Sequence, residues 1–359
     1  MSDDQLRADA QEISRRILAD DQLADRLRGR HLLLAGSNGF LGRVFCRAFE
    51  EMAAAGLGLT VDAVDNHVLS DRLHVDAYRP TSPAIRTISA DIATYWPQPK
   101  CRFYDYVLML AGIASPVHYR RLPFETFDVS VDGTRNMLDL AHAHVATMLF
   151  ASSSEVYGTP QVIPTPEEAS TLAPIRGERA CYDVGKMAAE TLCDMYQRCY
   201  KIFRAISVRL FNAYGAGLAA GDYRVLSTFA GQMARGERLR VYGHGAQTRT
   251  FTYVTDTVVG MLMALLRGTQ DVYNIGQPTP EITILELARL VERVTGRGWE
   301  PEIVVPPDTY VNEPRRRCPD IARARADLGF QPMVGLEEGL GRFFGWAGPA
   351  YRPAAGEPR

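Results

Sequence analysis

The sequence predicts an α/β fold: a Rossmann-type, doubly wound parallel sheet joined to a smaller C-terminal substrate-binding lobe. Two patterns indicate this class. From Arg30 onward, short apolar runs alternate with helical stretches, and strands buried on both faces of a parallel sheet are typically continuous Val, Ile and Leu runs. The first apolar run ends in a glycine-rich turn that opens a helix, as in dinucleotide-binding folds. The length of 359 residues leaves room for about two domains.

The expected elements follow this alternation along the chain. Residues 4–28 carry leucines and isoleucines close to one face of a helix, which predicts an N-terminal helical arm over residues 1–28. Glycine-rich loops and shorter helices after Phe211 predict the second lobe. The strands are expected at residues 31–36, 59–65, 85–91, 104–112, 147–154 and 205–210. The dinucleotide-binding domain is assigned to residues 29–210 with part of 250–276, and the smaller lobe to residues 211–249 and 277–348.

Composition and charge exclude several classes of protein. Apolar residues make up 46% and charged residues 23%, which is typical of a folded globular chain. Forty basic residues against forty-two acidic ones give a formal charge of −2, so a nucleic-acid partner is not expected. The longest strongly apolar run, residues 258–266, is much shorter than the roughly 18–20 residues that a membrane span needs. The polar N-terminus does not resemble a secretory signal, so we expect a cytoplasmic protein with no membrane partner.

The six cysteines are scattered through the chain. They form no C-x-x-C pair and no cluster with histidine at ligand spacing. We therefore expect reduced thiols and no metal site.

The glycine turn is a candidate dinucleotide site. Gly36, Gly39 and Gly42 permit a tight turn and a close approach of the backbone to a pyrophosphate at the helix N-terminus. Asp65 ends the second strand, where a carboxylate accepts hydrogen bonds from the adenosine ribose and repels a 2′-phosphate, so NAD is favoured over NADP. Asp91, after the third strand, is either an adenine contact or a helix cap. The residues assigned to NAD are Gly36, Gly39, Phe40, Leu41, Gly42, Asp65, Asn66, Asp91, Ile92, Leu110, Ala111, Gly112, Tyr182 and Lys186.

A Tyr-x-x-x-Lys pair is the candidate catalytic centre. Tyr182 and Lys186 stand four residues apart at an expected helix start, so both side chains project from the same face. A tyrosine with a pKa near 10 is a poor base at neutral pH, and a neighbouring lysine cation is expected to lower that pKa. The alternative is an amphipathic helix with a surface lysine.

Polar side chains follow the fifth expected strand, at the edge of the sheet where open α/β folds bind ligands. Ser153 and Ser154 can share a substrate hydroxyl with Tyr182, and Glu155 brings a carboxyl group to the same crevice. In the alternative interpretation, Ser153 caps a turn and Glu155 is solvated.

Several further side chains are candidates for binding a substrate. Arg249 follows a glycine loop and could meet a diphosphate or a carboxylate with its planar donor fork, or form a surface ion pair. For the arginines at 315–317, phosphate contact and a solvated charge run are equally good interpretations. His118 and Tyr119 could line a pocket.

The ordered series of motifs resembles the extended short-chain dehydrogenase/reductases, and within them the UDP-glucuronate decarboxylase (UDP-xylose synthase) family. The resemblance runs from about residue 30 to about residue 335 and rests on the segments GSNGFLG, ASPVHY, SSSEVYG, RACYDVGKMAAETLC, FNAYG, GHGAQTRTF, NIG with TILELA, and RRRCPDI. This chain departs from the family in having Ser153 for a usual Thr, Val184 for Glu, and the run Gly-Ala-Gly-Leu at 215–218 for Gly-Pro-Arg-Met.

The resemblance implies roles for individual residues. It implies that Tyr182 and Lys186 are the catalytic pair, with help from Ser153 and Ser154, and that Glu155 and Arg249 handle the carboxylate end of the sugar. The residues assigned to the substrate are Tyr119, Asn212, Arg224, Tyr242, Arg249 and Arg316.

The implied activity is the NAD-dependent decarboxylation of UDP-glucuronate through a 4-keto intermediate, giving UDP-xylose, UDP-4-keto-pentose or both. A nucleotide-sugar 4-epimerase or 4,6-dehydratase is the alternative enzyme, and a catalytically silent NAD-sensing protein is the alternative from another class. The resemblance also implies a homodimer formed by helices around residues 126–144 and 182–200.

Overall fold

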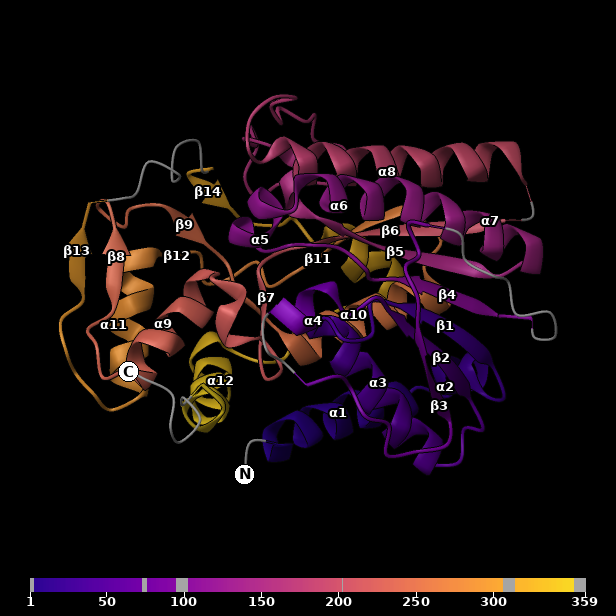
Figure 1. Cartoon of the computed structure of the whole chain (residues 1–359), viewed down its shortest axis with the longest axis horizontal. Coiled ribbons are helices and arrows are strands. Elements are labelled where there is room, and N and C mark those ends of the chain that lie inside the picture. The colour runs from indigo at the N-terminus through magenta and orange to yellow at the C-terminus, as the bar shows by residue number, and fades with distance from the viewer. Residues whose placement is uncertain (1–2, 73–75, 95–102, 202, 306–313, 352–359) are drawn as a thin grey trace.

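The computed structural model describes residues 3–72, 76–94, 103–201, 203–305 and 314–351, and Figure 1 shows their arrangement. Its centre is a seven-stranded sheet in the order β11-β6-β5-β4-β1-β2-β3, and every neighbouring pair is parallel. The strand order reverses between β1 and β4, as in doubly wound folds, which confirms the predicted class. The strands are β1 (His31–Ala35), β2 (Thr60–Asp65), β3 (Ile85–Ser89), β4 (Tyr106–Met109), β5 (Thr147–Ser153), β6 (Arg204–Leu210) and β11 (Val272–Ile275).

All six expected strands occur, and the seventh, β11, was not expected as a strand. It pairs with β6 at the edge of the sheet and covers only four residues. A run this short gives no period that separates a strand from a loop. It does fall within residues 250–276, which were assigned in part to the same domain.

Helices cover both faces of the sheet (Figure 1). α3 (Phe40–Ala54) and α10 (Val254–Arg267) bury their apolar side chains on one face, in one continuous core. α7 (Thr134–His144) and α8 (Ala180–Cys199) enclose a second core on the other face. Shorter helical segments are α4 (Val68–Arg72), α5 (Pro116–Arg121), α6 (Pro123–Asp128), η1 (Val129–Gly133), η2 (Ser154–Tyr157), η3 (Ala220–Asp222) and η5 (Ala324–Leu328).

The N-terminal arm is folded onto the body of the protein. It forms α1 (Asp3–Leu18) and α2 (Asp21–Leu27), and Ile13, Ile17 and Leu23 are fully buried in the core that also contains α3 and α10. Burial of such side chains stabilises each by about 1.5–3 kcal/mol relative to exposure. The apolar residues that recur with helical periodicity in this segment therefore form the face that is buried against the core.

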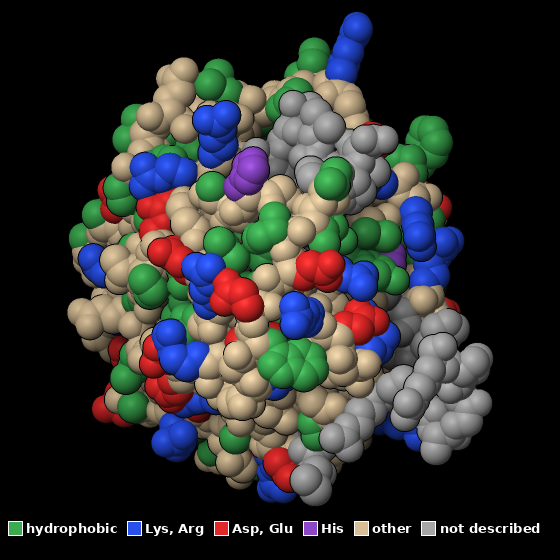
Figure 2. Space-filling view, turned by 90° about the vertical axis from the view of Figure 1, so that its left-hand side faces the viewer, with side chains coloured by type: hydrophobic (Ala, Val, Ile, Leu, Met, Phe, Trp, Pro, Cys, Tyr) green, Lys and Arg blue, Asp and Glu red, His purple; other side chains and the backbone are tan. Residues whose placement is uncertain are grey.

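The smaller lobe is built from short strands and three helices. Its helices are α9 (Val225–Ala234), α11 (Ile284–Val294) and α12 (Leu336–Ala350), and a capping box formed by Thr283 and Glu286 begins α11. Figure 2 shows basic and acidic side chains interspersed over the face of this lobe. The short strands are β7 (Ala213–Tyr214), β8 (Arg240–Tyr242), β9 (Thr248–Arg249), β10 (Thr252–Tyr253), β12 (Ile282–Thr283), β13 (Glu302–Val304) and β14 (Arg316–Arg317).

The division of the chain into an arm, a dinucleotide-binding domain and a second lobe stays a prediction. Among the described residues, the helices are all too short or too polar to cross a membrane.

Candidate active site

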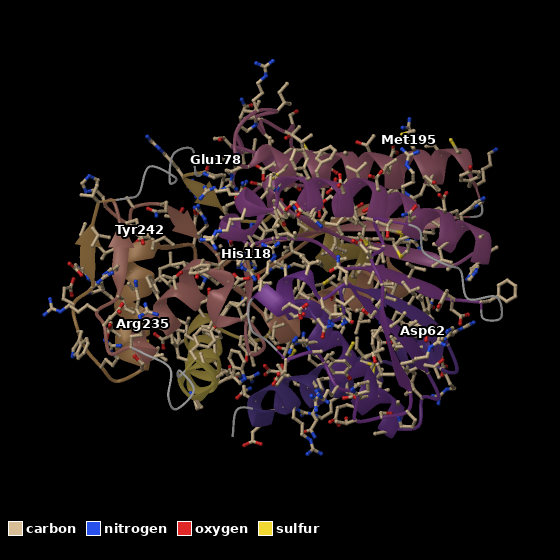
Figure 3. The ribbon with its side chains drawn as sticks, viewed as in Figure 1. Asp62, His118, Glu178, Met195, Arg235 and Tyr242 are labelled. Carbon is tan, nitrogen blue, oxygen red and sulfur yellow. The ribbon has the colours of Figure 1, made fainter. Side chains whose placement is uncertain are left out.

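A cleft of about 590 Å³ lies between the carboxyl ends of the sheet strands and the smaller lobe. Parallel strands end at one edge, so the segments that follow β1, β2, β4, β5 and β6 all reach this cleft. Figure 3 shows His118 near the middle of the molecule and Tyr242 in the smaller lobe, and both residues line the cleft.

The glycine turn forms the first wall of the cleft. Gly36 has a φ of +92°, and a Cβ on it would lie 2.6 Å from the backbone nitrogen of Ala111. A Cβ on Gly42 would lie 2.0 Å from the carbonyl oxygen of Gly36. Gly39 precedes the first turn of α3 without a capping side chain, so the backbone N–H groups of this turn have no side-chain acceptor from their N-cap. This turn fits the pyrophosphate of a dinucleotide.

The acidic end of β2 forms the next wall. The Asp65 carboxylate accepts hydrogen bonds from the backbone N–H groups of Asn38 and His67, at 2.8 Å each, which fix its orientation. Asp65 and Asn66 line the cleft. Asp91 lines it too, and the Asp91 carboxylate also accepts a hydrogen bond from the backbone N–H of Ala93 at 2.9 Å.

Most of the other residues assigned to NAD also line the cleft. They are Gly36, Gly39, Phe40, Leu41, Gly42, Ile92, Leu110, Ala111, Gly112 and Tyr182. Lys186 is not among the residues that line the cleft. It lies next to Gly112, which does line it, since a Cβ on Gly112 would be 3.3 Å from the Lys186 Nζ.

Tyr182 and Lys186 lie on the first turns of α8 and are both buried. Burial raises the pKa of Tyr182 to about 12, and a hydrogen bond with Ser153 acts in the opposite direction. The Lys186 ammonium donates to the carbonyl oxygen of Ala151 at 2.8 Å and lies 6.0 Å from the centre of the Tyr182 ring. Burial lowers the pKa of Lys186 to about 8.

The net pKa of Tyr182 is therefore raised, although Lys186 lies on the same helical face, because desolvation of the phenol is the largest influence on it. The structure brings the two side chains to one place, but desolvation of the phenol outweighs a cation that is engaged with a carbonyl group.

Glu155 lies among arginines rather than in solvent. Its Oε2 is 2.6 Å from Nη2 of Arg317 and 2.5 Å from Nη2 of Arg179. Burial acts to raise the pKa of Glu155, but Arg317, Arg179 and Arg249 outweigh it and hold that pKa at about 2. Glu155 is therefore ionised throughout the physiological range.

Asp183 lies next to this cluster. It is buried, and burial followed by the nearby charge of Glu155 raises its pKa to about 6. Its Oδ2 is 3.5 Å from Nε of Arg179, whereas its Oδ1 has no hydrogen-bond partner among the described residues.

Ser153, Ser154 and Tyr119 complete the central part of the cleft. The Ser153 hydroxyl accepts a hydrogen bond from the backbone N–H of Glu155 at 3.2 Å, so it caps the 3₁₀ turn η2 as well as contacting Tyr182. The Tyr119 ring stacks on the Tyr182 ring with centroids 5.4 Å apart.

The substrate assignments lie in the cleft with one exception. Asn212, Arg224, Tyr242 and Arg249 line it, as does Tyr119. Arg316 does not line the cleft; it is half exposed and pairs with Glu281.

Sequence reasoning missed three members of the charged cluster. Arg317, Arg179 and Asp183 all belong to it, although each stands one to three residues from an assigned position. Side chains alternate across a strand, so the choice within the arginine run at 315–317 depends on the pairing of β14 with β9, which the sequence does not reveal.

Comparison with known proteins places this geometry in a family. A family model described as the NAD dependent epimerase/dehydratase family matches residues 32–276. The chain belongs to this family. The fold class, the enzymatic character and NAD as the cofactor are thereby confirmed.

Within this family, the chain is similar in sequence to curated UDP-glucuronic acid decarboxylases. UDP-glucuronic acid decarboxylase 1 of Xenopus tropicalis is 36% identical over 314 residues, covering 87% of this chain and 71% of the relative. UDP-glucuronic acid decarboxylase 6 of Arabidopsis thaliana is 44% identical over 238 residues, covering 66% of this chain and 67% of the relative.

Solved structures share the fold. UDP-glucose 4-epimerase of Thermotoga maritima has a TM-score of 0.73 at 24% identity and covers 88% of this chain and 98% of its own. UDP-glucuronic acid 4-epimerase of Bacillus cereus, solved with a fluorinated UDP-glucuronic acid and NAD, has a TM-score of 0.74 at 21% identity and covers 89% of this chain and all of its own.

Proposed function

We propose that this protein decarboxylates UDP-glucuronate with NAD, through a 4-keto sugar, to UDP-xylose, UDP-4-keto-pentose or both. The observation that carries the proposal is that Arg179 and Arg249 line the cleft together with Glu155 and Tyr182. A substrate with a carboxylate matches these arginines, whereas a neutral hexose needs no such charge. The curated relatives, which are UDP-glucuronic acid decarboxylases, support the same choice.

Tyr182 takes the proton of the sugar 4-hydroxyl in this proposal. Ser153 holds the phenol oxygen by a hydrogen bond and is placed to share the same substrate hydroxyl. NAD, when bound by the glycine turn and Asp65, supplies the hydride acceptor for C4 and returns the hydride later. The positive charge of Lys186, 6.0 Å from the ring centre, favours the phenolate of Tyr182, and a bound NAD would add positive charge to the same cleft; both would act against the raised pKa of Tyr182.

Oxidation at C4 prepares the loss of carbon dioxide. The C5 carboxylate then lies β to a ketone, so the C5–C6 bond breaks and its electron pair enters an enolate at C4–C5. A proton from solvent at C5 would restore the ketone, and return of the hydride together with the proton held by Tyr182 would then convert it to the 4-hydroxyl of the pentose. If the ketone leaves first, the products are the 4-keto-pentose and NADH.

Glu155 is not the acid of this sequence, because arginines hold its pKa at about 2. We assign it to orienting Arg179 and Arg317. Arg249, which lines the cleft, is the proposed contact of the sugar carboxylate, and Asn212, Arg224 and Tyr242 are the proposed contacts of the UDP.

Mass spectrometry of products tests the proposal. The protein is incubated with NAD and UDP-glucuronate, and we expect released carbon dioxide and a sugar nucleotide that is lighter by that mass. A product of unchanged mass supports the 4-epimerase alternative. The dehydratase alternative needs a sugar with a 6-hydroxyl, so a parallel incubation with UDP-glucose tests it, and a product lighter by one water supports it. NADH absorbance that does not change with any of several UDP-sugars, together with unaltered substrate, supports the silent NAD-binding alternative.

We also propose a homodimer formed through the helices around residues 126–144 and 182–200; these are the end of α6, η1, α7 and α8, and the first three all pack against α8. Phe124, at the start of α6, is 79% exposed, and Met195 on α8 is 47% exposed, so both helices offer a large apolar side chain to a partner. Light scattering on the purified chain is expected to give twice the chain mass, and Phe124→Asp to give a monomer. Met333→Asp, an equally drastic change at an exposed site in the other lobe, is the matched control. A monomeric wild type would contradict the proposal.

The expected cytoplasmic location stays a prediction that cell fractionation tests.

A further inference from the structure

The N-terminal helix α1 packs behind one wall of the cleft and lies outside the part of the chain that the family model matches. The match begins at residue 32, whereas α1 spans Asp3–Leu18. Figure 1 shows α1 lying along α3, with α12 near its N-terminal end. α1 thus contacts helices of both the large sheet domain and the smaller lobe.

Leu6 of α1 packs beneath a loop that lines the cleft. Gly217 has a φ of +93°, and a Cβ on it would lie 3.1 Å from Cδ1 of Leu6 and 3.8 Å from Cδ2 of Phe40. Gly217 and Phe40 both line the cleft, one from the loop after β7 and the other from the glycine turn. Leu6 therefore packs close to cleft-lining residues of two segments, the loop after β7 and the glycine turn.

Asp9 makes a second link, to the strands that carry this loop. Asp9 is fully buried, and its carboxylate accepts a hydrogen bond from the Tyr253 hydroxyl at 2.8 Å. Tyr253 is paired with Tyr214 between β10 and β7, and β7 leads directly into Gly215, where the loop begins.

α12 holds the same loop from the other side. The Tyr351 hydroxyl at the end of α12 donates to the carbonyl oxygen of Leu218 at 2.7 Å. Arg342 of α12 is paired in turn with Glu12 of α1 at 2.7 Å. The loop itself has positive φ at Gly215 and Gly217 and therefore depends on such neighbours for its position.

We propose that α1 is a positioning element of the cleft: Leu6 and Asp9 set the position of residues 215–219, of which 217–219 line the cleft and lead along the chain to Arg224, a proposed contact of the UDP. The inference rests on the proposed function for the identity of the ligand. It assigns the N-terminal arm a part in substrate affinity rather than only in stability. A loop displaced by about 1 Å weakens the contacts made from it, because hydrogen bonds and packing both depend steeply on distance.

Calorimetry on the full-length protein tests the inference, with UDP-glucuronate, UDP and NAD as separate probes. Leu6→Ala is expected to raise the Kd of UDP and of UDP-glucuronate about five- to tenfold, a modest loss on the scale of about 1.4 kcal/mol per tenfold. The kcat is expected to stay within about twofold, since Leu6 touches none of the reacting groups. Leu6→Met, which refills the space, is expected to restore the affinity, and Tyr253→Phe to weaken it in the same direction.

Ile17→Ala is the matched control, because Ile17 lies on the same helix, is fully buried and contacts the same core. It is expected to lower the free energy of unfolding and to leave the Kd of UDP unchanged. An equal loss of affinity in Ile17→Ala, or an unchanged Kd in Leu6→Ala, overturns the inference. Weaker UDP binding by Leu6→Ala in a protein that never converts UDP-glucuronate supports the inference and overturns the proposed function instead.

Discussion

Replacing Arg317 by alanine tests whether the arginine cluster holds Glu155 as the structure indicates. Arg317 is 2% exposed, and its Nη2 and Nη1 donate to Glu155 Oε2 at 2.6 Å and to the carbonyl oxygen of Gly158 at 2.8 Å. Arg317→Ala removes both hydrogen bonds. Of the two arginines that form short ion pairs with Glu155, only Arg179 then remains.

The expected cost follows from the pKa of Glu155. A fall from 4.5 to about 2 corresponds to roughly 3 kcal/mol of stabilisation of the carboxylate. Breaking a buried ion pair typically costs about 3–5 kcal/mol. Because Arg179 persists, we expect Arg317→Ala to lower the free energy of unfolding by about 3 kcal/mol near neutral pH. Glu155 has a depressed folded-state pKa, so its contribution is present above about pH 4.5 and is lost as the pH falls toward 2.

The assay is equilibrium unfolding in urea at neutral pH for the wild type, Arg317→Ala, Glu155→Gln and the double variant. We expect a coupling energy of about 2 kcal/mol or more between the two sites. Arg316→Ala is the matched control, since Arg316 is half exposed and pairs with Glu281, and it should neither destabilise the protein appreciably nor couple to Glu155. A coupling energy below about 0.5 kcal/mol for Arg317, or equal values for Arg316 and Arg317, would refute the reasoning.

Three further predictions concern the remaining parts of the site and of the arm. Tyr182→Phe should abolish NADH formation and carbon dioxide release while the calorimetric Kd of UDP stays the same, and unchanged turnover would contradict its role as the base. Burial lowers the pKa of Lys186 to about 8, so kcat/KM should fall as the pH rises above about 8 and the ammonium loses its proton. In a pH-rate profile, Lys186→Arg should move this fall in kcat/KM to higher pH. Burial raises the pKa of Asp9 to about 6, so the folded state binds this proton more tightly and the free energy of unfolding should fall as the pH rises from about 4 to 6. Urea unfolding of Asp9→Asn should show a smaller fall over that range, and an identical pH dependence would argue against a buried titrating carboxyl group.

The sequence predicted those parts of the protein that depend on local pattern. The strands around the glycine turn and the acidic end of β2 follow from apolar runs and spacing, and the position of Tyr182 and Lys186 on one helical face follows from helix geometry. The raised pKa of Tyr182 did not follow, because it depends on how completely the phenol is desolvated and on where the Lys186 ammonium finds an acceptor. Both are consequences of tertiary packing.

The charged cluster shows the same limit more sharply. Glu155 lines the cleft, but its arginine partners come from the N-cap of α8 and from β14, 24 and 162 residues away in sequence. Only the register of β14 against β9 decides that Arg317 turns inward while Arg316 pairs with Glu281. A single sequence does not contain that register, so the prediction selected the neighbouring arginine.

The presence of a carboxylate among these arginines has a consequence for the proposed chemistry. Decarboxylation moves negative charge from the sugar carboxylate toward the oxygen at C4, so tight binding of the carboxylate in the ground state raises the barrier to its loss. Arg179 lines the cleft together with Arg249, and Glu155 already accepts a hydrogen bond from Arg179, which limits how strongly Arg179 can add to the binding of a substrate carboxylate by Arg249. Arginine without Glu155 would bind the substrate more tightly and release carbon dioxide more slowly. Glu155→Gln should therefore lower the KM for UDP-glucuronate and lower kcat with it, whereas a role for Glu155 in substrate binding alone predicts a higher KM at unchanged kcat.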